Sequence, residues 1–464
     1  MGRAHEDAAE RRLPWYGWLA VSILLAGEVG LLLDVLVIRI SFYFLAWWSY
    51  ILFADAWVWK LRGNSLLRSR SWEFLVLAFW SVPIWHLFEA ANFRLQNWSY
   101  VNVPARFPAG ALPSFLAYAT VLPGLFETYE LLSAFRIAEG ARMRPWRIRP
   151  SGLALSVVTG VAMLAAALLF PRAAYPLIWG FALFLLDPLC YRASLTRGRS
   201  LLGQFERGDP RPFLRLLLAG LICGGLWEFW NYWAYTKWIY TVPFFEDMKW
   251  FEMPPLGFLG FPPFTLECYV LANVLTYFRR GRGWEETAGS GSGAPRRLAV
   301  LAIAAALLWN GLIYAGIDRW TVLSYTPTLT DLDGIRADVV RRLGRAGVTM
   351  PPLLLTRTAT SERLTALSQV TGIPPDDLRT ARETARLADL MGLGATNANA
   401  LQRLGIMRVE ELARQDPEAL VLRWRTAVPS KPPSLAQVKA WVRAARRAVT
   451  PPWMLRWILP RTMG

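Results

Sequence analysis

The residues most able to do chemistry form one pattern of polar and aromatic side chains that occurs twice. Each copy reads Glu-x-x-Asn, Trp-x-Tyr, Val-Pro and Pro-x-x-x-Glu-x-Tyr, and corresponding residues lie 139 or 140 positions apart. Chance rarely keeps so many residues at one offset, so the sequence predicts an internal repeat. The candidate ligand-binding residues are Glu89, Asn92, Trp98, Tyr100, Glu127 and Tyr129 in the first copy and Glu228, Asn231, Trp238, Tyr240, Glu267 and Tyr269 in the second.

The four glutamates lie in or beside apolar segments, where a carboxyl group could bind a ligand, a proton or an ion. An Asn three residues after a Glu shares its helix face, so each Glu-x-x-Asn could hold one ligand group. Pro four residues before Glu127 or Glu267 suits a first helical turn, where an acid meets the positive end of the helix dipole. The alternative is that the acids only join helices by hydrogen bonds. Intramembrane acids are costly, which favours a functional site near the outer leaflet.

The repeated Trp-x-Tyr pairs and one histidine leave two interpretations open. The rings fit either an aromatic belt at the membrane interface or the wall of a pocket for an apolar or cationic ligand. His86 lies three residues before Glu89 and has no counterpart in the second copy. It is therefore a candidate for acid–base work, or else a structural histidine.

Composition indicates what carries these residues. The 464 residues are 54% hydrophobic and include 24 Trp. Apolar windows of about 20 residues recur, which matches the length needed to cross a ~30 Å hydrocarbon core. We expect an all-α polytopic membrane protein with spans near 15–37, 40–59, 72–93, 115–136, 152–171, 174–191, 212–234, 262–279 and 298–316.

The pattern groups eight of these spans into two repeats of four. Arg62-Gly-Asn-Ser-Leu-Leu67 matches Arg197-Gly-Arg-Ser-Leu-Leu202 between the second and third span of each repeat. Two units with an even number of spans insert in parallel and are related by an axis along the membrane normal. The predicted parts are a tail 1–14, repeat one 15–136, a basic linker 137–151, repeat two 152–279, a Gly/Ser/Arg linker 280–297, a ninth span 298–317, a soluble helical domain 331–448 and an apolar tail 449–464.

The charge distribution predicts the orientation. The net charge of +17 lies largely in alternate loops, as the positive-inside rule requires of cytoplasmic loops, and so does not need a nucleic-acid partner. The N-terminus is then cytoplasmic, the aromatic loops 94–114 and 235–262 face outside, and nine spans place the C-terminal domain outside the cell (inner) membrane.

No motif indicates a metal or a cofactor, and we predict neither. Cys190, Cys223 and Cys268 lie in or beside apolar segments without metal-ligand spacing, and the chain has only two histidines. A nucleotide-binding loop and a Ser-His-Asp set are also absent from the sequence. Whether the protein is an enzyme stays open.

The C-terminal region carries a second recognisable pattern. Gly392 and Gly394 permit a tight hairpin between two short helices, Ala398 and Leu401 pack the second helix, and Gly405 ends it. This resembles the helix-hairpin-helix superfamily. The run 332–448, with LADLMGLG, GI-x-x-x-EEL-A and PSLAQVKAWVRAAR, resembles a bacterial domain of unknown function built of tandem helix-hairpin-helix-like units.

The resemblance implies two kinds of partner. Such hairpins offer backbone N–H groups to DNA phosphates, and this region is mildly basic. The predicted location outside the cytoplasm favours a protein partner or self-interaction over nucleic acid. The chain is thus expected to be a transporter-like protein or an enzyme on a lipophilic substrate, with a small or lipophilic ligand in the bilayer. The alternative is a membrane-anchored scaffold.

Overall fold

The computed structural model describes residues 11–242, 248–285, 296–428 and 432–449. Most of the expected 1–14 tail, of the 280–297 linker and of the 449–464 tail lies outside these residues. The chain forms two compact units. Unit 1 comprises Met1–Asn97, Phe107–Ala234 and Phe244–Thr321, and unit 2 comprises Trp98–Arg106, Tyr235–Pro243 and Val322–Gly464.

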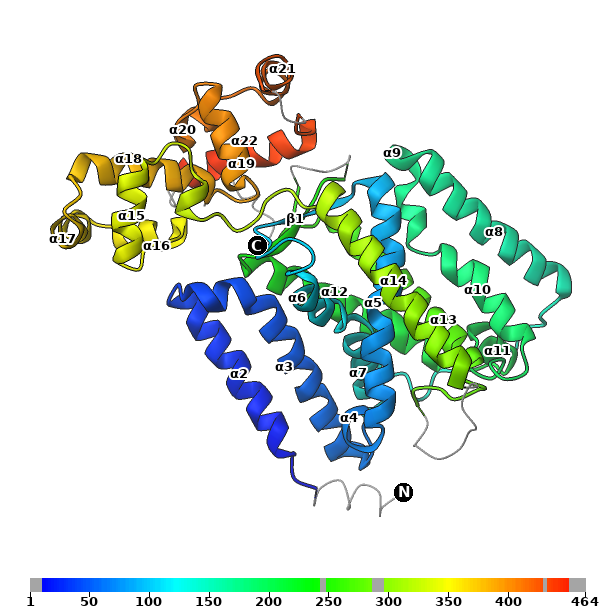
Figure 1. Cartoon of the computed structure of the whole chain (residues 1–464). Coiled ribbons are helices and arrows are strands. Elements are labelled where there is room, and N and C mark those ends of the chain that lie inside the picture. The colour runs from blue at the N-terminus through cyan, green and yellow to red at the C-terminus, as the bar shows by residue number, and fades with distance from the viewer. Residues whose placement is uncertain (1–10, 243–247, 286–295, 429–431, 450–464) are drawn as a thin grey trace, which may run out of the picture. The chain divides into compact units, whose positions relative to one another are not determined.

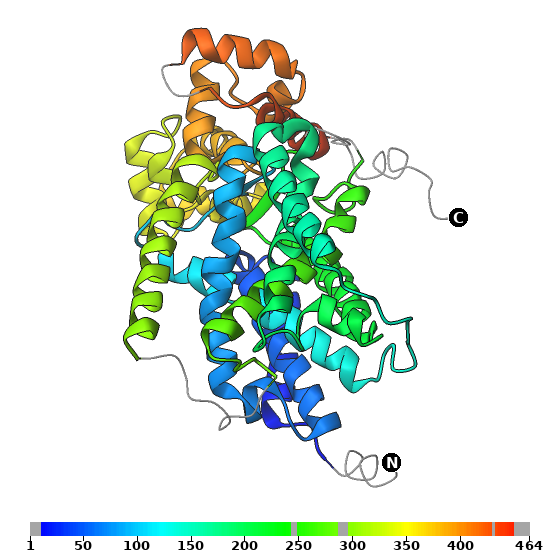
Figure 2. The same ribbon diagram turned by 90° about the vertical axis from the view of Figure 1, so that its right-hand side faces the viewer.

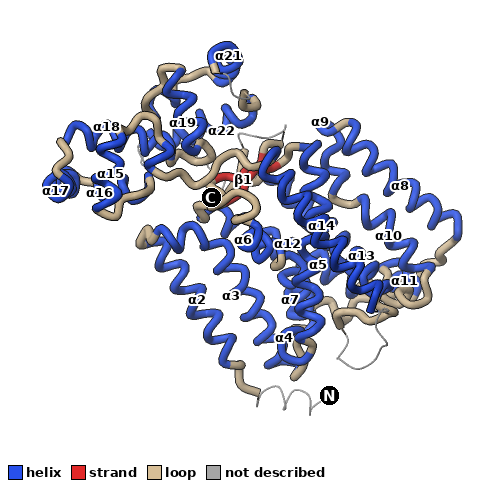
Figure 3. The backbone as a smooth tube through the Cα atoms, in the orientation of Figure 1, coloured by secondary structure: helices blue, strands red, loops and turns tan. Residues whose placement is uncertain are grey.

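Unit 1 is helical (Figure 3). Its elements are α2 (Trp15–Leu32), α3 (Leu36–Arg62), α4 (Leu66–Ser69), α5 (Ser71–Leu95), α6 (Ala111–Tyr118), α7 (Val121–Ala134), α8 (Pro150–Leu169), α9 (Pro171–Ala174), η1 (Tyr175–Ile178), α10 (Phe181–Arg192), α11 (Leu201–Glu206), α12 (Arg211–Trp233), η2 (Pro255–Gly260), α13 (Phe261–Phe278) and α14 (Arg296–Trp320). Within the described residues, eight helical segments are long and apolar enough to cross a membrane.

The packing of unit 1 follows one order in both halves of the chain. In the first half α2 packs on α3, α3 on α7 and α7 on α5; in the second α8 packs on α10, α10 on α13 and α13 on α12 (Figure 1). Small residues permit the close approaches. A Cβ on Gly160 of α8 would lie 2.7 Å from the Phe181 carbonyl oxygen of α10, and one on Gly220 of α12 would lie 2.7 Å from the Phe261 carbonyl oxygen of α13.

Helix α14 lies alongside α5 (Figures 1 and 2). The Trp309 indole N–H donates to the carbonyl of Pro83, a proline inside α5, at 3.2 Å. One turn further, His86 Nδ1 and Asn310 Oδ1 lie 2.8 Å apart. The expected ninth span therefore packs against the third.

Two expected span boundaries are wrong. The first break lies at Leu33–Val35, not near Arg39, because Asp34 adopts a left-handed φ of 54° that ends α2. The expected single span 115–136 is two helices, α6 and α7, and neither is among the eight described segments long and apolar enough to cross a membrane, where the sequence predicts nine. Backbone groups at this break find side-chain partners, since Ser81 Oγ donates to the Tyr118 carbonyl at 2.6 Å and accepts from the Leu122 N–H at 3.1 Å. Such a break is tolerated where protein covers it.

Unit 2 combines two strands with a helical domain. Strands β1 (Trp98–Val101) and β2 (Lys237–Tyr240) pair antiparallel. The remaining elements are η3 (Leu329–Asp331), α15 (Ala337–Arg345), α16 (Pro351–Arg357), α17 (Ser361–Thr371), α18 (Pro375–Ala388), α19 (Gly394–Arg403), α20 (Val409–Ala413), α21 (Pro417–Ala427) and α22 (Leu435–Val449). Their core includes Trp424 and Trp441, whose rings lie 6.0 Å apart.

Candidate functional site

The structure buries the four glutamates completely, all within unit 1. Glu89 lies in α5, Glu127 in α7, Glu228 in α12 and Glu267 in α13, each with an exposed fraction of 0%. Glu127 and Glu267 are both the seventh residue of their helices. They are therefore a turn beyond the helix start, which corrects the expectation that each acid meets the dipole of its own helix.

The Glu-x-x-Asn pairs lie in the last turns of α5 and α12, as the sequence predicts. Glu89 Oε1 accepts from the Trp85 indole N–H at 2.9 Å. Asn92 Oδ1 accepts from the Asn97 backbone N–H at 2.8 Å, which closes the chain after α5. In the second copy, Glu228 lies near Tyr43 of α3. Glu89 and Asn92 thus have structural partners of their own.

Glu267 caps another helix. Its Oε1 accepts from the Ala182 backbone N–H at 2.8 Å, and Ala182 is the second residue of α10. The first N–H groups of a helix lack partners in their own helix and favour a negative charge. The carboxyl of Glu267 therefore joins α13 to α10, which is a structural task.

Glu127 has no such partner. Neither of its buried carboxyl oxygens accepts a hydrogen bond from an N–H or hydroxyl group among the described residues, and the only side chain placed to share a proton with it there is the carboxyl of Asp55. The charged side chains that act on it are Asp55, Glu130 and Arg70, of which Asp55 acts most strongly. Buried carboxyl groups in folded proteins are nearly always hydrogen-bonded, so an orphaned one calls for an explanation.

Asp55 of α3 is the acid beside Glu127. It is buried and accepts from the Tyr16 hydroxyl at 2.6 Å, the Ser65 hydroxyl at 3.0 Å and the Leu67 N–H at 2.6 Å. The last two contacts lie at the start of the short helix α4. In the second half, Asp187 of α10 accepts from the Leu201 and Leu202 N–H groups, both at 2.9 Å, at the start of α11. Each short helix is thus capped by an acid from the preceding long helix.

A buried ion pair completes the surroundings of Glu127. Arg70 donates to Glu130 at 2.7 Å, and the two side chains are only 4% and 5% exposed. Arg70 also donates to the Trp284 carbonyl at 2.7 Å, and the Trp284 ring stacks on Phe126 with centroids 4.7 Å apart. The sequence reasoning missed Arg70, Glu130 and Trp284. The one feature of the sequence that could have pointed to these residues is Asp55, an acid within an apolar segment, and no function was predicted for it.

The two tyrosines that follow Glu127 and Glu267, Tyr129 and Tyr269, differ in their contacts. Tyr269 donates its hydroxyl to the Arg199 carbonyl at 2.8 Å and accepts from Gln204 at 3.0 Å, so it holds the segment around α11. Tyr129 instead packs edge-on against Trp284, with ring centroids 5.8 Å apart.

The Trp-x-Tyr residues belong to unit 2. Trp98 pairs with Tyr240 and Tyr100 with Trp238 across β1 and β2. The four rings are residues of a sheet, and the four acids are residues of the helical unit.

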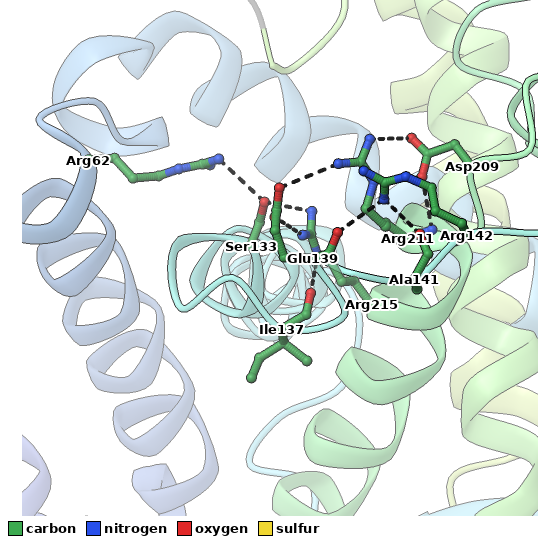
Figure 4. A network of polar contacts seen from close by, with 9 residues as sticks. All are labelled: Arg62, Ser133, Ile137, Glu139, Ala141, Arg142, Asp209, Arg211 and Arg215. Atoms are coloured by element: carbon green, nitrogen blue, oxygen red, sulfur yellow. Dashed lines mark hydrogen bonds and ion pairs between the residues drawn. The ribbon is translucent and has the colours of Figure 1, made fainter. Parts of the chain in front are cut away.

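Two groups of ion pairs join the halves of unit 1. Glu73, at the start of α5, binds Arg279 and Arg282, which follow α13. Arg215, near the start of α12, binds Glu139 at 2.9 Å, Ser133 at 3.0 Å and the Ile137 carbonyl at 2.8 Å (Figure 4). In the same network Arg211 binds Asp209 at 2.7 Å, which lowers the pKa of the Asp209 carboxyl.

The sequence predicts no metal site, and the candidate metal ligands in the described part of the chain are its His, Cys, Asp and Glu side chains. No group of three or more His, Cys, Asp or Glu side chains there has the arrangement to hold a metal ion. The three cysteines are free and buried. His86 is 2% exposed and is held against Asn310.

The hairpin glycines adopt the conformations that the sequence requires. Gly392, Gly394 and Gly405 have φ angles of 78°, 68° and 79°. After α19, the Ile406 N–H donates to the Leu401 carbonyl at 2.9 Å across Gly405, as in a Schellman turn. Ala398 and Leu401 are fully buried.

Comparison with known proteins identifies one region. Residues 333–448 match the model of a domain of unknown function (DUF4332). This confirms the predicted resemblance of the C-terminal region. None of the curated proteins and none of the solved structures compared with the chain matches it.

Proposed function

We propose that the chain is an integral membrane protein of the cell (inner) membrane in which Glu127 binds and releases a proton, as in a transporter. One observation carries the proposal: the fully buried carboxyl of Glu127 has no hydrogen-bond donor on its oxygens among the described residues, and the side chain that acts most strongly on it is a second acid, Asp55. Acids kept inside membrane helices despite their cost commonly belong to ion pathways and proton relays.

The proton is the ligand that best suits this site. A metal ion would need three or more His, Cys, Asp or Glu side chains arranged around it, and no such group occurs in the described residues. Asp55 is the acid that acts most strongly on Glu127, and two neighbouring carboxyl groups can share one proton. Tyr16 and Ser65 already bind Asp55, so they hold it in place beside Glu127.

The proposal includes the two parallel repeats of four spans. Its support is the matching order of helix packing and the matching place of Glu127 and Glu267 in their helices. It also includes a cytoplasmic N-terminus, for which the basic loops are the support. In this arrangement one copy of each repeated acid can be structural while the other exchanges protons.

Infrared difference spectroscopy tests the proton site directly. The full chain in lipid nanodiscs is compared between mildly acidic and mildly basic buffer. We expect a carboxyl C=O difference band that Glu127→Gln removes, that Asp55→Asn shifts, and that the matched variant Glu267→Gln leaves unchanged. A band that survives both Glu127→Gln and Asp55→Asn contradicts the proposal.

Transport needs a second measurement. Proteoliposomes that contain a pH-sensitive dye are given a pH gradient, and the wild type is expected to equalise it faster than Glu127→Gln. Equal rates for the two proteins, together with the infrared band of the wild type, would show a proton site without transport.

A scaffold role is the alternative that a specific observation favours. Gly392, Leu393 and Gly394 of the C-terminal hairpin are buried within the protein. This favours a C-terminal domain that contacts protein, and DNA contacts through this hairpin are disfavoured.

A further inference from the structure

The repeated Trp-x-Tyr residues build a small sheet with two different faces. The register pairs Trp98 with Tyr240, Ser99 with Ile239, Tyr100 with Trp238 and Val101 with Lys237. Side chains alternate between the faces of a strand, so the four rings lie on one face. Ser99, Val101, Lys237 and Ile239 lie on the other face, which we call the aliphatic face after Val101 and Ile239.

The segment that leads into the C-terminal domain adds a third strand-like stretch beside β1. The Leu323 N–H donates to the Tyr100 carbonyl at 2.8 Å, the Val103 N–H to the Ser324 carbonyl at 3.0 Å, and the Thr326 N–H to the Val103 carbonyl at 2.9 Å. Tyr100 and Val322 form a parallel bridge. We call β1, β2 and residues 322–326 together the platform.

The hairpin between α18 and α19 sits on the platform. A Cβ on Gly392 would lie 3.2 Å from Val101 Cγ1 and 3.8 Å from Ile239 Cδ1, both on the aliphatic face. A Cβ on Gly394 would lie 2.6 Å from Ser324 Cβ, closer than such atoms approach. With their positive φ angles, the two glycines are the residues that permit this contact.

Side-chain hydrogen bonds fix the hairpin at both ends. The Tyr235 hydroxyl, just before β2, donates to Asp389 at 2.7 Å, and Asn397 Nδ2 donates to the Leu323 carbonyl at 3.3 Å. From the domain side, the Trp441 indole N–H donates to the Gly392 carbonyl at 3.0 Å and holds the turn in shape. The hairpin therefore contacts both strands and the connecting segment.

We propose that this hairpin is a protein-recognition site whose ligand is the platform, and that its docking holds the two Trp-x-Tyr strands together. A lone two-stranded ribbon is marginally stable in water and needs a packed face. One strand comes from each half of the chain, so the docked hairpin clamps a loop of one half to a loop of the other. Hairpin docking and strand pairing stabilise each other, so a change that separates β1 from β2 also weakens the binding of the hairpin to the platform. This inference is independent of Glu127.

Hydrogen exchange on the full chain in nanodiscs tests the clamp with a matched pair of glycines. Gly394→Ala adds a methyl group against Ser324, whereas Gly405→Ala adds one with nothing within 4 Å, and both residues have similar positive φ angles. We expect Gly394→Ala to speed exchange in β1 and β2 by about tenfold or more, and Gly405→Ala to leave the strands unchanged. Amides of α17 serve as the internal reference for stability of the domain.

A second variant tests reciprocity from the platform side. Ile239→Ala trims the side chain that faces Gly392 and changes nothing in the C-terminal domain. We expect faster exchange at residues 389–394 with α17 unchanged. The clamp is overturned if the strands exchange at the wild-type rate in Gly394→Ala, or if the hairpin does so in Ile239→Ala. Salt-dependent binding of a labelled DNA duplex by the wild type that Gly394→Ala abolishes would also overturn it, in favour of nucleic acid as the ligand.

Discussion

Glu127 and Glu267 occupy the same place in two helices and do different things. Each is the seventh residue of its helix and completely buried. Glu267 accepts from a backbone N–H at the start of α10, whereas the side chain that acts most strongly on Glu127 is another acid, Asp55. Corresponding acids in the two halves therefore make different contacts. In the second half the acid joins two helices, and in the first half it lies beside another acid.

The ion pairs that join the halves show the same principle with the charges exchanged. At the offset of 140, Glu139 corresponds to Arg279. Glu139 binds Arg215 of α12, while Arg279 binds Glu73 of α5. The acid follows α7 in the first half, and the base follows α13 in the second. An ion pair joins the halves at both places, although the acid and the base have exchanged positions.

The largest predicted effect comes from leaving Glu73 buried without its partners. Its side chain is 1% exposed, and Arg279 and Arg282 both bind it. We expect Arg279→Ala combined with Arg282→Ala to lower the free energy of unfolding by about 3–5 kcal/mol, because an uncompensated buried charge remains. Denaturant unfolding in detergent micelles measures this, and Arg149→Ala, at an exposed residue, is the control.

We expect the loss of the Glu139–Arg215 ion pair to lower the free energy of unfolding by less. Glu139 is 43% exposed, and Arg215 keeps its bonds to Ser133 and Ile137 when Glu139 is removed. Glu139→Ala should therefore cost about 1 kcal/mol. Equal losses for the two variants would show that the pairs are energetically equivalent and that the reversal has no consequence for stability.

The helical class and the positions of most spans could be predicted because apolar length is a local property of the sequence. The break between α6 and α7 could not be predicted in this way, since its hydrogen bonds come from Ser81 on another helix. Asp34 shows a similar limit. Its left-handed conformation moves the first break by several residues from where the Arg39 charge suggested it.

The candidate site was predicted in its residue types but not in its grouping. Spacing identified Glu127 and Glu267, yet their different tasks depend on α10 and on Asp55, which lie far away in the sequence. The Trp-x-Tyr residues were considered for a belt or a pocket. Strand pairing between two distant loops leaves no local signal beyond the alternation of four residues, so the sheet was missed.

Glutamine substitution at the two repeated acids gives the next effect in size. Glu267→Gln keeps an acceptor for the Ala182 N–H but puts an amide in place of the carboxyl at the start of α10. We expect a loss of about 0.5–1.5 kcal/mol in the free energy of unfolding. Glu127→Gln is expected to be neutral or stabilising, because it removes a carboxyl group that lies beside Asp55. A larger loss for Glu127→Gln than for Glu267→Gln would reverse the assignment of roles.

The smallest predicted effect concerns the position before the third span, where the halves differ again. At the offset of 139, Asp209 corresponds to Arg70, so an acid at 24% side-chain exposure stands where the other half has a buried base. The bond to Arg211 lowers the pKa of Asp209 in the folded state. Its stabilisation is therefore present above the ordinary Asp pKa of about 4 and is lost as the pH falls through the lowered folded value.

Asp209→Asn should remove that acid-dependent part and lower stability near neutral pH by less than about 1 kcal/mol, as for other partly exposed pairs. The measurement is thermal unfolding of the wild type, Asp209→Asn and Arg211→Gln over the acidic range. The two variants should show the same reduced pH dependence, because each breaks the same pair. An unchanged acid dependence in Asp209→Asn would show that the destabilisation of this region by acid arises elsewhere, and the comparison with Arg70 would then rest on burial alone.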